Sequence, residues 1–375
     1  MNEPNLQNGD RDVVVIVSMS RGIGGPARAL LAALPRLAEF ERVLFAPAGG
    51  FARLAVARGD VERHVPMAAA GRVRQLSRVR ASRQLLRLVR ECGDRLVAIH
   101  ANGETDLNLA AVPALATGTP VVMWAHSSEP SPTAGLLRAF WRRRRRVAWL
   151  AVSEVARATL ADILRIDPAS ITIVENPIDP EDVTGQRTTN ERPQVGYLGL
   201  TTQAKGFDLL PEVVRRVGPT IAGWRLFVSE PHPMAMPEEL DAWRQLQELG
   251  DSHDVTIAGR TTDLARAYGS CDVVLCPSQS ESFGRVAAEA MAAGIPVVAS
   301  DIPAYRRLVA EPGAGLLFPL GDAAAAAEAV SRLAEDPELR SSMGQRGREA
   351  VRRYDPAFIG AQLTRAYREA GGEPG

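Results

Sequence analysis

Two glutamates, Glu281 and Glu289, stand close together in a stretch of mostly small residues, 278–300. Residues 286–293 are apolar on every helical face except at Glu289, so a helix here is expected to be buried and to carry that carboxylate inside with it. A buried carboxylate needs hydrogen-bonding partners, and an ionised one accepts bonds from hydroxyl groups. The spacing therefore indicates a site for a ligand rich in hydroxyls.

The elements that would position these glutamates follow from the local sequence. The runs 273–275 and 296–299 predict strands, with a helix between them that starts near Gly284 and stops at Gly294. The start of such a helix presents unpaired N–H groups and the positive end of the helix dipole, which together suit a phosphate.

Hydroxyls on both sides of a phosphate describe a nucleotide sugar. Glu281, in the loop before the helix, is then expected on the sugar, and Glu289, about 7 to 9 Å inside the helix start, on the ribose. The alternative is a helix-capping Glu281 and a core Glu289 that is paired with a neighbouring arginine.

The same stretch resembles the donor signature of family-four retaining glycosyltransferases, which have the GT-B fold. The resemblance rests on Glu281, seven residues, Glu289, and the following Ala-Met-Ala-Ala-Gly and Pro-Val-Val-Ala-Ser-Asp. Other segments agree with it in order: a strand and glycine turn at 13–25, a strand that ends at His126, and the segment 195–208.

The resemblance implies roles for individual residues. It makes His126, Lys205 and Glu281 the catalytic residues, and it places no metal ligand. It assigns donor binding to a larger set: Gly24, Gly25, Lys205, Arg260, Thr261, Glu281, Ser282, Phe283, Gly284 and Glu289.

Strands alternate with helices throughout the chain, which indicates parallel sheets with ligands at the carboxyl ends of their strands. The resemblance implies an α/β architecture of two doubly wound, Rossmann-like domains facing a cleft. The expected division is an N-terminal acceptor-side domain at 1–190, a nucleotide-sugar-binding domain at 191–350, and a C-terminal helix at 351–375 that crosses back to the first domain.

Lys205 is the single lysine among 44 basic side chains. A chain that uses arginine for every other cation has kept one ammonium, a compact and mobile charge that suits a leaving group. The resemblance places at this turn a lysine that grips the donor diphosphate. The family usually has an arginine after Gly199, where this chain has Leu200; Arg260 and Arg285 are candidates to replace that arginine.

Composition agrees with a two-domain enzyme, because 375 residues that are 46% hydrophobic can bury two cores. No apolar run approaches the roughly 18 residues that cross a membrane, and residues 1–12 hold no signal-peptide core, so a cytoplasmic protein is expected. The three cysteines form no zinc-type cluster with histidine, so neither a disulfide framework nor a structural metal is expected.

The formal net charge is zero, but the part before residue 190 has an excess of basic residues and the part after it an equal excess of acidic ones. Arginines at 72–90 and 142–146 account for much of the basic excess. The first group falls on a helix with one apolar side, which could lie on an anionic membrane at its inner face or form the solvated outer layer of a sheet. No aromatic residues interleave these arginines, which argues against nucleic-acid binding.

Three alternatives compete with this interpretation. Gly22-x-Gly24-x-x-Ala27 would pass as the fingerprint of an NAD-dependent oxidoreductase or epimerase, but the second strand ends in Ala46-Pro47 where such an enzyme needs an acid. A metal-dependent transferase needs Asp-x-Asp after a strand, and Asp10-Arg11-Asp12 precedes the first strand. A catalytically degraded nucleotide-sugar-binding protein is the third.

The reaction implied by the resemblance moves a sugar from a UDP- or GDP-linked donor to an acceptor hydroxyl with retention, in glycan, glycolipid or secondary-metabolite biosynthesis. No second acid is identifiable opposite Glu281, which argues against a double displacement. We therefore expect a same-face displacement in which the departing diphosphate helps to deprotonate the acceptor, with no metal or other cofactor. The acceptor is left open among lipids, polysaccharides and aglycones.

Overall fold

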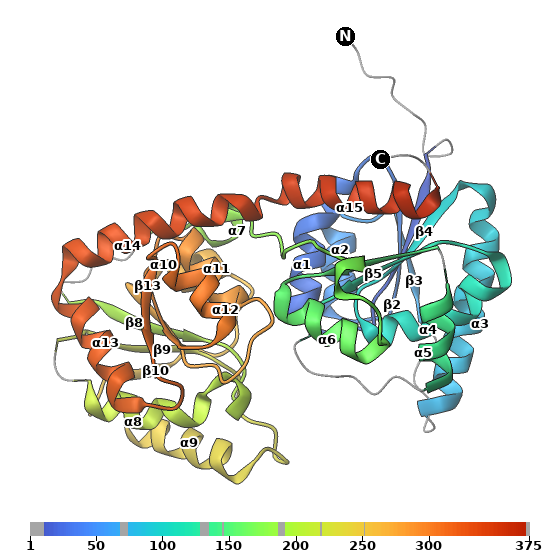
Figure 1. Cartoon of the computed structure of the whole chain (residues 1–375). Coiled ribbons are helices and arrows are strands. Elements are labelled where there is room, and N and C mark those ends of the chain that lie inside the picture. The colour runs from blue at the N-terminus through green and yellow to red at the C-terminus, as the bar shows by residue number, and fades with distance from the viewer. Residues whose placement is uncertain are drawn as a thin grey trace. The chain divides into compact units, whose positions relative to one another are not determined.

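The computed structural model describes residues 11–67, 74–127, 135–144, 146–186, 192–217, 220–250 and 252–372. The chain forms two compact units (Figure 1). Unit 1 holds the chain up to Pro177 and again from Pro356, and unit 2 is Ile178–Asp355. The division therefore lies earlier than residue 190, the boundary expected from the sequence.

Within its described residues, unit 1 has a 7-stranded sheet in which every strand pair is parallel. Its strand order is β3-β2-β1-β4-β5-β6-β7. The central strands are apolar runs without alternation, as expected for strands that are buried on both faces. The strands are β1 (Val13–Val17), β2 (Glu41–Ala46), β3 (Arg63–Pro66), β4 (Leu96–Ala101), β5 (Val121–Ala125), β6 (Val147–Ala151) and β7 (Ile171–Ile173).

Helices cover this sheet, and the last of them, α15 (Pro356–Gly371), comes from the end of the chain (Figure 1). It packs on β4, β5 and β6, burying Ile359, Leu363 and Tyr367, whereas Phe358 is exposed. The others are α1 (Gly25–Ala33), α2 (Gly50–Ala57), α3 (Arg74–Cys92), α4 (Glu104–Thr117), α5 (Gly135–Arg143) and α6 (Glu154–Leu164).

His100, in β4, belongs to this core. Its ring is fully buried, and Nδ1 lies 2.9 Å from the hydroxyl of Tyr367 on α15. Burial lowers the pKa of His100 to about 4, and a hydrogen bond that the ring makes to Asn102 raises it by less. His100 therefore stays neutral at physiological pH and joins α15 to the sheet.

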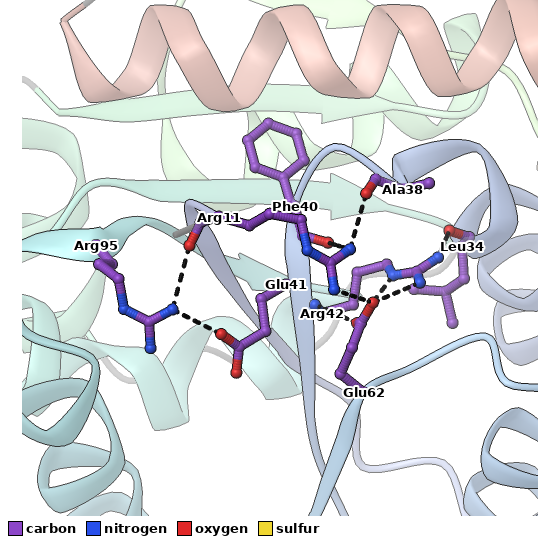
Figure 2. Close-up of polar contacts among 8 residues, drawn as sticks. All are labelled: Arg11, Leu34, Ala38, Phe40, Glu41, Arg42, Glu62 and Arg95. Atoms are coloured by element: carbon purple, nitrogen blue, oxygen red, sulfur yellow. Dashed lines mark hydrogen bonds and ion pairs between the residues drawn. The ribbon is translucent and has the colours of Figure 1, made fainter. Parts of the chain in front are cut away.

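The amino ends of β1, β2 and β4 are tied together by ion pairs (Figure 2). Glu62 accepts from Arg42 and pairs with Arg11 at 3.0 Å, while Arg95 pairs with Glu41 at 2.7 Å. Burial alone would raise the pKa of Glu62, but the bonds and charges of Arg42 and Arg11 outweigh it, so that the pKa is lowered. This cluster is structural, because it lies at the edge opposite to the carboxyl ends of the strands.

Unit 2 has a 6-stranded sheet within its described residues, in the order β10-β9-β8-β11-β12-β13 and parallel throughout. Buried aliphatic and aromatic residues, among them Trp224, Phe207 and Phe318, fill its core. The strands are β8 (Gln194–Leu198), β9 (Gly223–Phe227), β10 (Val255–Ile257), β11 (Val273–Cys276), β12 (Val297–Ser300) and β13 (Gly315–Phe318).

The strand, helix and strand expected at 273–299 are confirmed as β11, α11 and β12, and Gly294 has the expected left-handed φ of 73°. The α/β class with two parallel sheets is confirmed as well. The helices of unit 2 are α7 (Pro180–Val183), α8 (Leu210–Arg216), α9 (Pro237–Glu248), α10 (Leu264–Gly269), α11 (Arg285–Ala292), α12 (Pro303–Tyr305), α13 (Ala323–Glu335) and α14 (Pro337–Ala350).

Each sheet has one topological switch point, where the chain leaves a central strand toward one edge and later returns to the other side of that strand. In unit 1 it lies between β1 and β4, and in unit 2 between β8 and β11. Loops that follow two such strands diverge and leave a crevice at the carboxyl edge, which is where open α/β sheets bind ligands.

Candidate active site

Lys205 and Glu281 meet at the switch point of unit 2. Lys205 ends a short turn, η4 (Gln203–Lys205), after β8, and Glu281 lies in the loop after β11. The ammonium Nζ is 2.8 Å from Glu281 Oε1. The structure thus joins two residues that the sequence analysis proposed separately.

A glycine allows the two loops to approach each other this closely. Gly206 has a left-handed φ of 67°, and a Cβ atom there would lie 1.9 Å from the carbonyl oxygen of Pro277. The backbone N–H of Gln279 also donates to Ala204 at 3.0 Å, which ties the β11 loop to the lysine turn. The position of Lys205 is therefore set by backbone contacts as well as by its ion pair.

Glu281 is also held by two hydroxyl groups that the sequence analysis did not identify. Ser278 Oγ donates to Glu281 Oε1 at 3.1 Å, and Tyr305 Oη at 3.3 Å. Burial, and then the charge of Glu281, raise the pKa of Tyr305 well above its ordinary value, so its hydroxyl stays protonated and can donate. Ser278 could have been found as a hydroxyl directly after a strand; Tyr305 gave no local signal.

Glu289 is engaged by protein groups on both oxygens. It is 1% exposed, Arg285 Nε lies 2.7 Å from Oε1, and the hydroxyl of Tyr268 donates to Oε2 at 2.8 Å. This is the arrangement foreseen by the alternative interpretation, a core glutamate paired with a neighbouring arginine. The assignment of Glu289 to a ribose stays a prediction.

The start of α11 is fixed by a glycine, and its role as an anion site stays a prediction. Gly284 precedes the helix with a left-handed φ of 90°, and a Cβ atom there would lie 2.7 Å from the ring of Tyr305. Ser282 lies in the loop before it, and Phe283 is buried with its ring 5.1 Å from that of Tyr354. Phe283 thus contributes packing and backbone to the loop, while its side chain belongs to the core.

The two arginines that could replace the family's arginine differ in their exposure and partners. Arg285 is committed to Glu289, whereas Arg260 and Thr261 lie exposed after β10, the edge strand of the sheet. Leu200 is 48% exposed just after β8, and its carbonyl accepts a bond from the hydroxyl of Tyr197 at 2.8 Å. Of the two candidates to replace the family's arginine, Arg260 is the accessible one.

In unit 1, His126 follows β5 and is oriented by Asn102, which follows β4. Asn102 Nδ2 donates to the carbonyl of Pro26 at 3.3 Å, so Oδ1 faces His126 Nε2, 2.9 Å away. An amide oxygen accepts, so Nε2 carries the proton. The ring also packs against Trp124, with centroids 4.6 Å apart.

Two buried acids lie at the switch point of unit 1, in the first turn of α4, and sequence reasoning missed both. Asp106 Oδ1 accepts from the backbone N–H of Met19 at 2.8 Å, which joins the loop after β1 to the first turn of α4. The pKa of Asp106 is raised to about 8, chiefly by burial. The hydrogen bond from Met19 lowers this pKa, and the nearby charge of Glu104 raises it. The signal that could have found them is two acids within a few residues of a strand end.

Gly24 and Gly25 lie at the start of α1, after the carboxyl end of β1. A Cβ atom on either would meet no atom within 4 Å, so the packing of the described residues does not require glycine there. Open space beside two glycines agrees with the expectation that a ligand approaches this backbone closely. Their role in donor binding stays a prediction.

The fold is that of known two-domain transferases. A glycosyltransferase from Rickettsia africae superposes with a TM-score of 0.80 at 15% identity, covering 96% of this chain and 99% of that one. Anabaena HepE in complex with UDP-glucose gives 0.79 at 19% identity, covering 94% and 98%. These likenesses show that the chain has the GT-B fold.

The sequence comparisons identify the family. The model of glycosyltransferase family 4 matches residues 22–182, and that of glycosyl transferases group 1 matches residues 180–350. The phosphatidyl-myo-inositol mannosyltransferase of Mycolicibacterium smegmatis is 32% identical over 290 residues, which are 73% of this chain and 71% of that protein. The chain belongs to glycosyltransferase family 4, which confirms the resemblance and excludes an oxidoreductase.

Proposed function

We propose that this glycosyltransferase takes a UDP- or GDP-linked sugar as donor and transfers the sugar to an acceptor hydroxyl with retention. The observation that carries the proposal is the Lys205–Glu281 pair at the switch point of unit 2, 2.8 Å apart and beside the start of α11. A cation, a carboxylate and helix N–H groups together match a diphosphate joined to a sugar. HepE, the Anabaena neighbour, is a structure with UDP-glucose bound.

In this proposal each group has one task. Lys205 stabilises the charge that develops on the departing diphosphate, together with the N–H groups at the start of α11. Glu281, oriented by Ser278 and Tyr305, accepts bonds from the sugar hydroxyls. Catalysis is then mostly orientation and charge stabilisation, with the diphosphate helping to deprotonate the acceptor.

We propose that unit 1 binds the acceptor and that His126 contacts the donor sugar, as the family resemblance implies. The hydrogen bond that His126 Nε2 donates to Asn102 Oδ1 sets the ring orientation and the proton position that such a contact needs. The relative from Mycolicibacterium smegmatis is named for phosphatidyl-myo-inositol, which supports a lipid bearing a polyol headgroup as the first acceptor to test. We also propose that the transfer needs no metal ion.

The donor class is tested most directly by thermal-shift measurements with UDP-, GDP- and ADP-sugars, each with and without EDTA. A ligand at 100 times its Kd adds about 2.7 kcal/mol to the free energy of unfolding, so the true donor raises Tm and the others do not. Release of UDP or GDP in the presence of inositol lipids then measures transfer. If none of these sugars stabilises the protein, the proposal is contradicted. A strict requirement for Mn²⁺ would contradict the part of the proposal that says no metal ion is needed.

We further propose that α3 makes peripheral contact with an anionic membrane through its charge. Its apolar residues Leu85, Leu88 and Val89 are buried and α3 packs on α4, as expected in the alternative of an outer layer on the sheet, so these three residues do not face lipid. The exposed face carries arginines instead: Arg78, Arg80, Arg83, Arg87 and Arg90. In the described part of the chain no helix is long and apolar enough to cross a bilayer.

Vesicle flotation tests this contact. The protein is expected to float with vesicles that contain phosphatidylglycerol and not with pure phosphatidylcholine, and 0.5 M salt, about five times the ionic strength at which the Debye length is ~10 Å, should release it. Changing the five exposed arginines of α3 to glutamine should abolish flotation. Flotation of that variant equal to the parent protein would show that α3 is not the contact.

A further inference from the structure

Glu239, in the first turn of α9, binds the backbone of two separate loops with its two carboxylate oxygens. Oε2 accepts from the N–H of Met236, directly before the helix, at 3.0 Å. Oε1 accepts from the N–H of Gln203, at the start of the lysine turn, at 2.9 Å. The residue is 7% exposed, so both bonds are shielded from water.

Helix capping explains only one of these bonds. A glutamate in the first turn commonly accepts from the backbone N–H that precedes its helix, as Oε2 does here. The bond of Oε1 spans 36 residues and leaves the helix altogether. A capping residue has no need of this second bond, whereas the lysine turn does.

The lysine turn is closed by three backbone bonds and held by one side chain. Lys205 N–H and Phe207 N–H donate to Thr202 at 3.0 and 3.2 Å, and Gly206 N–H donates to Gln203 at 2.8 Å. The hydroxyl of Tyr197 donates to the carbonyl of Lys205 at 3.3 Å. The N–H of Gln203 points out of that turn, where a backbone donor needs an acceptor from elsewhere. Glu239 supplies it from one side, and the β11 loop binds Ala204 from the other.

We propose that Glu239 is a positioning residue for Lys205. By holding the Gln203 N–H, the carboxylate keeps the turn in the place from which the ammonium reaches Glu281 and the departing diphosphate. This inference rests on the proposed function of Lys205. Because the other oxygen holds Met236, Glu239 also couples the loop after β9 to the same turn.

The test compares Glu239→Gln with Glu238→Gln, a matched change at the exposed neighbour in the same helical turn. A glutamine has one acceptor oxygen and its NH₂ group opposes the second N–H, so one loop is released. A misplacement of about 1 Å near the chemistry can cost about 100-fold, so Glu239→Gln should lower kcat by about 10- to 100-fold with little change in the donor KM. Glu238→Gln should leave both unchanged.

A double-mutant cycle separates positioning from a merely structural role. If Glu239 acts through Lys205, Glu239→Gln should cause no further loss of kcat in a Lys205→Ala background. An equal fold-loss in both backgrounds would overturn the proposal, and so would wild-type kcat in the single variant.

Amide hydrogen exchange measures how firmly the lysine turn is held, and it does not depend on catalysis. Amides at residues 203–206 should exchange faster in Glu239→Gln and not in Glu238→Gln, at a temperature well below the unfolding transition. Unchanged exchange would overturn the positioning role even if kcat fell as expected. If no sugar is transferred by any form, the proposed function fails, and the exchange result still decides whether Glu239 holds the turn.

Discussion

Lys205→Ala is expected to lower kcat about 100- to 1000-fold while the fold persists, the range seen when one preorganised charge-stabilising group is removed from a site. The lysine is the single ammonium of the chain, and its Nζ lies 2.8 Å from Glu281 at the switch point of unit 2. Its loss leaves the departing diphosphate with the helix N–H groups and more distant arginines. Lys205→Arg should restore little activity, because a planar guanidinium does not fit a site shaped around a compact ammonium.

Steady-state kinetics with the donor that stabilises the protein would measure this loss, and circular dichroism would confirm that the variant is folded. Arg215→Ala is a suitable control, because it removes an exposed cation from α8 in the same unit. Near-normal turnover of Lys205→Ala would disprove the assigned role. A large rise in KM at unchanged kcat would show that Lys205 binds the donor equally in the ground state and the transition state.

Glu289→Ala is expected to reduce the free energy of unfolding by about 3 to 5 kcal/mol, because it leaves a partner charge buried without compensation. The side chain of Arg285 is only 12% exposed, and its Nε lies 2.7 Å from the carboxylate. The hydroxyl of Tyr268 loses its acceptor as well. Urea denaturation of the variant, with Glu328→Ala on the exposed face of α13 as control, would measure the effect.

The cycle of Glu289→Ala, Arg285→Ala and the double variant should show strong coupling, since removing both partners relieves the unpaired charge. A loss below about 1 kcal/mol for Glu289→Ala would show that the ion pair does not support the core. Glu289→Gln, kept well below its Tm, then tests the ribose assignment. A weaker affinity for UDP or GDP would support that assignment, and an unchanged affinity would confine Glu289 to the core.

Much of the architecture could be predicted from the sequence, because it depends on local patterns. Apolar runs of strand length between helical segments predicted parallel sheets, and Gly284 and Gly294 marked the ends of α11 correctly. The resemblance carried by the glutamate spacing and the residues after it identified the right enzyme family. Periodicity also indicated that Glu289 would be buried, and it is 1% exposed.

The apolar side of α3 shows where pattern alone is ambiguous. A helix with one apolar side has the same sequence whether that side meets lipid or another helix, and here α4 covers it. Such a choice depends on which element is adjacent in space, and the periodicity of one segment contains no information about its neighbour.

By itself the sequence determined the order of strands and helices, the GT-B class and the candidates Lys205, Glu281 and His126. Only the tertiary structure decided their partners. A parallel sheet brings together the carboxyl ends of strands that are distant in the chain, and so Lys205 meets Glu281, His126 meets Asn102, and Glu239 meets the lysine turn. These contacts depend on strand order and side-chain orientation, which arise when the whole sheet forms and cannot be read from the spacing of residues within one segment.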